Sequence, residues 1–141
     1  MARVTGVPDK YESHPEGTRA VQLIGAQTPS AALDVLGRCA RERSCGTPGG
    51  AGGGLAQALH LINGSTINAK LRGGTLARLL AGPASVREWV DDLYLRALGR
   101  PASPAEQTEW TQRLARAADR SLVAEDLLWA LLNSREFAFN H

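Results

Sequence analysis

The sequence predicts an all-α fold, a small helical bundle preceded by an irregular, Gly/Pro-rich N-terminal arm. Helix start and stop signals follow one another without interruption between Ser85 and Glu106. Apolar residues recur at helical spacing through most of residues 55–134. Proline and glycine instead interrupt residues 1–54, where periodicity is weak.

The helix predicted after Ser85 has clear boundaries. Ser85 and Glu88 have the spacing of a capping box, in which each side chain accepts a backbone N–H of the first turn. Gly99 suits the left-handed position that follows a last turn, and Pro101 cannot continue the helix. Ser103–Glu106 repeats the box with proline at the first helical position, so a second helix is expected at once.

This helix has one broad apolar side, made of Val86, Trp89, Val90, Leu93, Tyr94 and Ala97. Leu95 points away from that side, so we expect it to touch a second neighbour. A following helix is expected over 104–117. A last helix over 122–132, begun by Asp119 or Ser121, is apolar on most of its circumference and so is either buried or covered by a partner.

Each of the last three predicted helices carries one tryptophan: Trp89, Trp110 and Trp129. Short connections favour antiparallel neighbours, so we expect the three indoles to converge in a single core. A tryptophan cluster serving as a ligand platform is the alternative.

The chain is expected to divide at the end of a glycine-rich linker. Residues 1–54 form the irregular arm and linker, with a short extended piece at 18–24 and helical turns at 30–36 begun by Ser30. Residues 55–141 form the helical module, with short helices at 55–62, 67–71 and 76–81 and a three-helix core at 85–134. Thr75 is expected to cap the helix that starts at Leu76.

Charge and hydropathy limit the partners. The net charge is +2, and the basic cluster of Arg38, Arg41 and Arg43 lacks interleaved aromatic residues, so no nucleic-acid partner is expected. No run of about 18 apolar residues is present, so no membrane span is expected. Cys39 and Cys45 are either two ordinary thiols or one small disulfide loop.

Motifs for the common chemistries are missing from the sequence. The spacings that mark zinc ligands or covalently attached haem do not occur, and the glycine-rich run at 47–54 lacks the Lys-Ser/Thr ending of a phosphate loop. Asp91-Asp92 and Glu125-Asp126 are neighbours in helices, so their carboxylates diverge. We expect no cofactor and no metal. The one candidate cluster is Cys45, His60, Asn63 and Asn68.

Four separated blocks resemble the C-terminal end of a planctomycete-type domain-of-unknown-function family, DUF fifteen-fifty-three, whose members are large PSD-type proteins associated with cytochrome-c-like domains. The blocks are Leu55–Gly64, Thr66–Leu71, Leu93–Pro101 and Asp126–Phe137. Three earlier segments resemble the stretch that precedes this end: Val4–Pro8, Gly17–Val21 and Leu33–Arg38. The segment around Tyr94 and Trp110 is similar, more weakly, to a helical repeat of bacterial surface proteins.

The resemblance implies that this chain is a fragment or truncated product, with Met1 an internal start, and that longer relatives are exported to the cell envelope. It supplies no catalytic residues. The family's Cys-x-Cys-Glu-Arg-like run is matched here only at Cys45, so any site formed by that run is in doubt.

The sequence therefore favours a non-catalytic structural or interaction module, the C-terminal end of a larger cell-envelope protein. Its expected partner is an upstream domain of a longer chain or another envelope protein. The alternative is a fragment of an enzyme that acts on an extracellular polymer or in redox chemistry, with its active groups mainly outside this chain. A calcium or transition-metal site is a third hypothesis.

Overall fold

The structure is a computed structural model, and it describes residues 1–24, 28–35, 59–60 and 64–139. The all-α prediction is confirmed, and no strand occurs among these residues. The chain divides into two compact units: Met1–Val7 together with Ala69–His141, and Pro8–Asn68. We call these the helical unit and the inserted unit. The predicted boundary at residues 54 and 55 lies outside the described residues.

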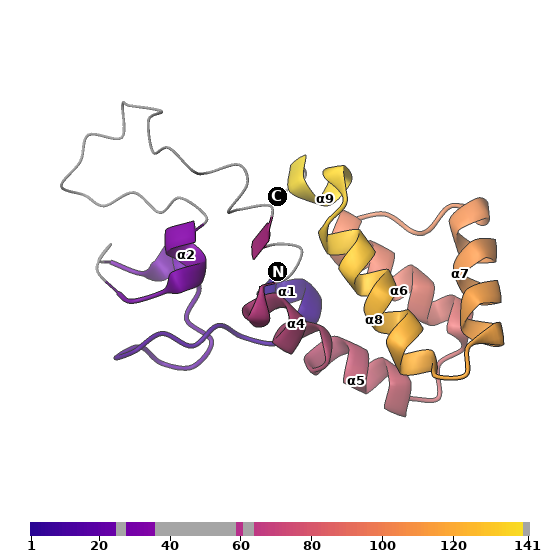
Figure 1. Ribbon diagram of the computed structural model, residues 1–141, viewed down its shortest axis with the longest axis horizontal. Coiled ribbons are helices and arrows are strands. Elements are labelled where there is room, and N and C mark those ends of the chain that lie inside the picture. Colours follow the sequence, from indigo (N-terminus) through magenta and orange to yellow (C-terminus); the bar gives the residue numbers. More distant parts are fainter. Residues whose placement is uncertain (25–27, 36–58, 61–63, 140–141) are drawn as a thin grey trace. The chain divides into compact units, whose positions relative to one another are not determined.

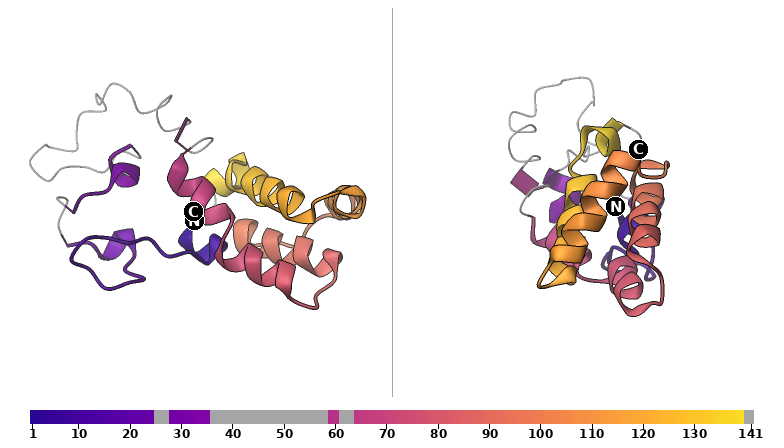
Figure 2. Two further views of the ribbon diagram at one scale, coloured as in Figure 1. Left: turned by 60° about the horizontal axis from the view of Figure 1, so that its bottom comes forward. Right: turned by 90° about the vertical axis from the view of Figure 1, so that its right-hand side faces the viewer.

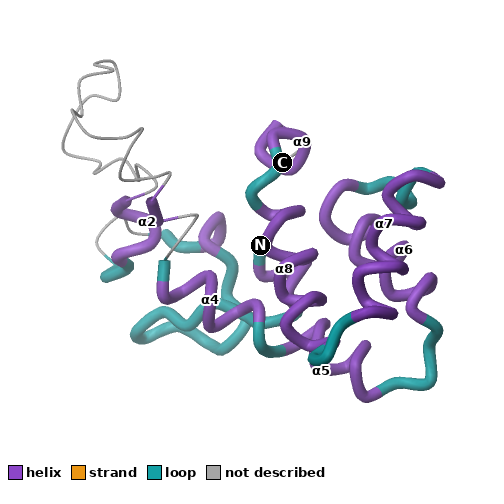
Figure 3. The backbone as a smooth tube through the Cα atoms, turned by 45° about the vertical axis from the view of Figure 1, so that its right-hand side comes forward, coloured by secondary structure: helices purple, strands orange, loops and turns teal. Residues whose placement is uncertain are grey.

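Three helices of 13 residues each make the centre of the helical unit: α6 (Val86–Leu98), α7 (Pro104–Arg116) and α8 (Arg120–Leu132). Short loops join them (Figure 3). Both predicted capping boxes are present, since Ser85 and Ser103 accept the backbone N–H of Glu88 and Glu106. Gly99 ends α6 with φ of 71°. The predicted signals therefore set the real ends of these helices.

The expected antiparallel arrangement holds only in part. Figure 2 shows α6 and α8 lying across the left-hand view and α7 nearly end-on, so α7 is inclined to both, and it contacts both of them. The buried residues of α7 are only Gln107 and Leu114, so this helix has a narrow contact face.

The core is built from leucine rather than tryptophan. Its fully buried side chains come from α5, α6, α7 and α8 and include Leu76, Val90, Leu93, Leu114, Leu127 and Leu128. Trp89 is buried, but Trp110 and Trp129 are only half-buried. The prediction of three indoles in one dry interior is therefore wrong. Trp129 follows Leu128 by one position, which turns it about 100° away from the buried side of α8.

Leu95 is also placed differently from the prediction. It was expected to pack against a second neighbour, but it is exposed on the outer side of α6. The buried residues of α6 lie on one broad side, so this helix is covered there and open to solvent at Leu95.

Two shorter helices contact this centre, α5 (Gly74–Ala81) and α9 (Arg135–Phe139). A third, α4 (Ser65–Leu71), precedes α5 in the chain and spans the boundary between the two units. The helix predicted at 76–81 is confirmed with an earlier start. Thr75 does not cap it, because Gly73 occupies the N-cap position and Thr75 is buried in the first turn. The helix predicted at 55–62 lies largely outside the described residues.

The first residues of the chain are more regular than predicted. α1 (Ala2–Thr5) contacts α5 and α6 of the helical unit, and Val4 and Thr5 are buried (Figure 1). The Met1 carbonyl accepts the backbone N–H of Val4 at 2.9 Å and that of Thr5 at 3.0 Å. A segment assigned by its sequence to an irregular arm is therefore part of the helical core.

The inserted unit contains η1 (Ala20–Gln22) and α2 (Ala31–Val35). The helical turns predicted after Ser30 are confirmed, and the Ser30 carbonyl accepts the Asp34 N–H at 3.0 Å. The extended piece predicted at 18–24 is instead a 3-10 turn over residues 20–22. The Gln22 side chain accepts the Arg19 N–H at 2.7 Å, which favours a turn over an extended chain.

Candidate functional site

The strongest polar cluster of the helical unit centres on Arg100, between Gly99 and Pro101. Its guanidinium donates to Glu136 of α9, with Nε–Oε1 at 2.7 Å and Nη2–Oε2 at 2.9 Å. It also donates to Glu106 of α7, with Nη1–Oε2 at 2.9 Å and Nη2–Oε1 at 3.1 Å. The guanidinium carbon lies 5.4 Å from the centre of the Tyr94 ring. We call these four residues the Arg100 cluster.

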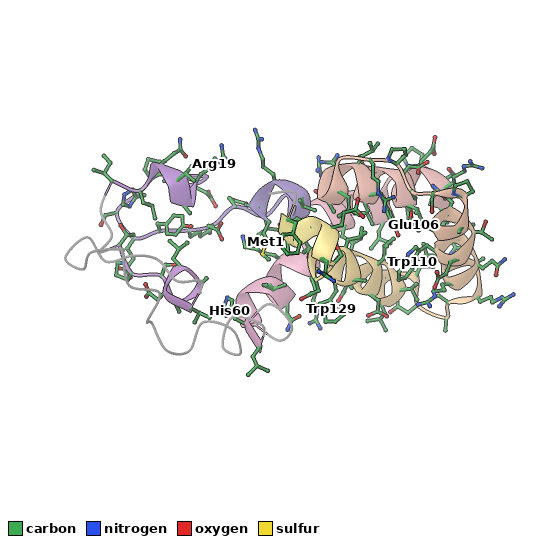
Figure 4. The ribbon with its side chains drawn as sticks, turned by 90° about the horizontal axis from the view of Figure 1, so that it is seen from above. Met1, Arg19, His60, Glu106, Trp110 and Trp129 are labelled. Atoms are coloured by element: carbon green, nitrogen blue, oxygen red, sulfur yellow. The ribbon has the colours of Figure 1, made fainter. Side chains whose placement is uncertain are left out.

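The local sequence positions this cluster. Gly99 ends α6 in the left-handed conformation and turns the chain before Arg100. Asp91 stabilises the same loop by accepting the Ala102 N–H at 3.2 Å. Glu106 already caps α7 by accepting the Ser103 N–H at 2.7 Å, so its carboxylate is fixed beside the loop. Figure 4 shows Glu106 on α7 of the helical unit.

The electrostatics of the Arg100 cluster favour its charged state. Hydrogen bonds from Arg100, reinforced by those at Ser103, lower the pKa of Glu106 to about 2. Hydrogen bonds from Arg100 also lower the pKa of Glu136, and the two carboxylates raise the pKa of Arg100. Burial raises the pKa of Tyr94, and the nearby charge of Glu106 adds to that rise. Arg100, Glu106 and Glu136 are therefore held in ion pairs at neutral pH and are not poised to transfer protons.

An open groove of about 520 Å³ lies between α7 and α8. Trp110, Ala117 and Val123 supply its apolar part, with Arg113, Arg116 and other polar residues around them. The Arg113 guanidinium carbon lies 4.9 Å from the Trp110 ring centre, and Arg113 pairs with Glu109 at 2.7 Å. Arginine thus covers one face of the indole, which makes this tryptophan a poor platform for stacking a ligand.

A second open groove, of about 400 Å³, lies between α5 and α6. Its charged residues are largely paired within their own helices. Arg96 donates to Asp92 at 2.6 Å, and Arg78 donates to the Thr75 hydroxyl at 3.3 Å. Ser85 lowers the pKa of Glu88 through backbone and side-chain hydrogen bonds. Arg96 and Asp92 thus form an ion pair, whereas Arg78 and Glu88 are hydrogen-bonded to uncharged groups, so the groove presents both signs of charge.

Two buried polar atoms have no hydrogen-bond partner among the described residues, Nε1 of Trp89 and Oε1 of Gln107. Gln107 uses its other terminal atom, because Nε2 donates to the Arg87 carbonyl at 3.0 Å. An unpaired buried polar atom costs about 1–3 kcal/mol, so the contact between α6 and α7 is weaker than its burial suggests.

The candidate cluster predicted from the sequence is only partly described. Cys45 and Asn63 lie outside the described residues, as do Cys39 and the cluster of Arg38, Arg41 and Arg43. His60 is half-buried, and its carbonyl accepts the Gly64 N–H at 2.8 Å. Asn68 is exposed on α4. Their meeting in one cleft stays a prediction, and so does the enzyme-fragment alternative that depends on it.

Sequence reasoning missed the Arg100 cluster. Glu106 was recognised as a capping residue, but nothing in the local pattern linked it to Arg100 or to Glu136, which lies 30 residues further along the chain. An arginine between a helix-ending glycine and a proline, with a capping glutamate nearby, was the available signal for one half of the cluster.

Two further observations concern the described part of the chain. There, no three His, Cys, Asp or Glu side chains gather as a metal site would require. No helix in those residues has the length and apolar character needed to cross a bilayer. Comparison with protein families, curated proteins and solved structures found no match to this chain.

Proposed function

We propose that this chain is a non-catalytic interaction module that completes a larger cell-envelope protein. The observation that carries the proposal is the exposure of large apolar side chains on three helices of the helical unit. Leu95 on α6 is 51% exposed, Leu122 on α8 is 56% exposed and Phe139 on α9 is 79% exposed. We call these three residues the exposed trio.

The state of the acidic residues supports the non-catalytic part of the proposal. The carboxylates with lowered pKa all have structural partners. Glu88 and Asp119 cap helices, while Glu106 and Glu136 pair with Arg100. A general acid at neutral pH needs a raised pKa instead. The envelope setting and the larger protein rest on the family resemblance of the sequence.

Dye binding and sedimentation test the proposal. The wild-type chain is compared with a variant that carries Leu95→Ser, Leu122→Ser and Phe139→Ser. We expect the wild type to bind a hydrophobic dye or to self-associate at micromolar concentration, and we expect the variant to lose this behaviour while its helical circular dichroism is kept. Surface substitutions of this kind change stability little.

A matched control is Leu127→Ser, which places serine at a buried position of α8 and should lower the melting temperature instead. A wild-type chain that stays monomeric and binds no dye would contradict the proposal. Equal dye binding by the wild type and the folded triple variant would contradict the role of the exposed trio.

A further inference from the structure

The docking of residues 1–7 on the helical unit carries an inference about a partner. α1 sits against α5 and α6, and the chain then leaves for about 60 residues, Pro8–Asn68, before it returns at Ala69. We call the surface that receives Met1–Val7 the α1 site. Along the chain, residues 1–7 are connected to the rest of the helical unit only through the inserted unit.

The α1 site fits the backbone of its occupant closely. Gly6 and Gly74 both have positive φ, 68° and 57°. A Cβ atom on Gly74 would stand 2.2 Å from the Thr5 carbonyl oxygen, and one on Gly6 would stand 2.8 Å from the Thr75 hydroxyl oxygen. Any larger residue at either glycine would separate the two backbones.

Burial and one long-range hydrogen bond complete the contact. Val4 and Thr5 are almost fully buried, 3% and 1% exposed. The buried Lys70 side chain donates from Nζ to the Val7 carbonyl at 2.7 Å. A methyl of Val7 would lie 3.2 Å from a Cβ on Gly73, so this end of the segment is also held closely.

We propose that the α1 site also accepts residues 1–7 of a second copy of this chain, which gives an exchanged dimer. The contacts are the same whichever copy supplies the segment, so the exchange costs no packing in the helical unit. Each helical unit of the dimer is completed by Val4, Thr5 and Gly6 of the other copy. This partner does not involve the exposed trio, so the proposal is independent of the proposed function.

Tethering decides when the exchange is visible. A tethered segment experiences an effective concentration on the order of a millimolar, so its own helical unit outcompetes a second copy at micromolar concentration. The exchange should therefore be absent from the wild-type chain in dilute solution and appear as its concentration approaches the millimolar range. If a chain's own residues 1–7 can no longer occupy its α1 site, residues 1–7 of a second copy should bind there at a lower protein concentration.

Two full-length variants remove that competition. Val4→Asp places a charge on a buried position of α1 and leaves the α1 site intact. Gly74→Val closes the α1 site and leaves residues 1–7 intact. We expect a mixture of the two variants to form a one-to-one dimer in sedimentation at 0.1–1 mM, an order of magnitude tighter association than either shows alone. The double variant mixed with either single variant should stay monomeric.

Monomers alone in the mixture at 1 mM would overturn the proposal if both variants keep their helical circular dichroism. If either variant loses that signal, a synthetic peptide of residues 1–8 is used instead to test whether the α1 site binds a segment from another molecule. This peptide should raise the melting temperature of the Val4→Asp chain or restore its helical signal, whereas the same peptide with aspartate at position 4 should not. Equal behaviour of the two peptides at 2 mM would overturn the proposal.

Discussion

Replacing Arg100 with alanine removes the cation that joins α7 and α9 and leaves the carboxylates of Glu106 and Glu136 facing each other. The Arg100 side chain is 38% exposed, so solvent screens these pairs, and the pair with Glu106 contributes about 0.5–1 kcal/mol. The lost contact with the Tyr94 ring adds about 0.5–1 kcal/mol. The free energy of unfolding should fall by about 1–2 kcal/mol.

Thermal denaturation followed by circular dichroism measures this change. A helical unit of about 80 residues loses roughly 4–8 °C for each kcal/mol, so Arg100→Ala should lower the melting temperature by roughly 4–16 °C at pH 7. Arg113→Ala is the matched control. Arg113 also pairs with a glutamate and covers an aromatic ring, but its side chain is 57% exposed and it joins no second helix. Its loss should cost no more than roughly 4 °C.

The pH dependence separates ion pairing from packing. The pKa of Glu106 is lowered in the folded state, so its stabilising effect is complete above the ordinary pKa of 4.5 and is lost as the pH falls toward about 2. The difference between the wild type and Arg100→Ala should therefore shrink over that range. Equal melting temperatures of Arg100→Ala and Arg113→Ala at pH 7, or a difference independent of pH from 5 to 2, would refute the reasoning.

Three further predictions concern the helical unit. Leu128→Ala should lower the free energy of unfolding by about 2–5 kcal/mol in chemical denaturation because the side chain is fully buried, whereas Leu122→Ala on the exposed side of α8 should change it by less than about 0.5 kcal/mol. Gly74→Ala should lower the free energy of unfolding by at least about 1 kcal/mol more than Gly99→Ala does. Both positions have positive φ, but only Gly74 lies against another backbone segment. Equal losses for the two variants would show that α1 does not approach α5 this closely. Ser103→Ala should cost about 1 kcal/mol through loss of the cap of α7, and a melting temperature equal to that of the wild type would contradict the capping geometry.

Local signals were enough to predict where the central helices begin and end. Ser85, Gly99 and Ser103 act within one or two turns of their own position, so their effects can be identified before any tertiary contact is known. The all-α class followed from the same signals together with the helical spacing of apolar residues. The turn after Ser30 was predicted in the same way.

The burial of individual side chains was predicted less accurately than the helix ends, because burial depends on which helices become neighbours. Trp110 and Trp129 were expected in the core, yet α7 buries only Gln107 and Leu114, and Trp110 lies beside an open groove. Leu95 is exposed because none of the described elements covers that side of α6. Periodicity defines a face of a helix, and only the packing decides whether that face is covered.

The sequence by itself determined the helical class, the helix boundaries at Ser85, Gly99 and Ser103, and the apolar side of α6, because these depend on neighbouring residues. Only the tertiary structure brought Arg100 to Glu136 and placed Val4 beside α5, because both contacts join residues far apart in the chain. The distances between such residues depend on the packing of the whole unit, which no local pattern encodes.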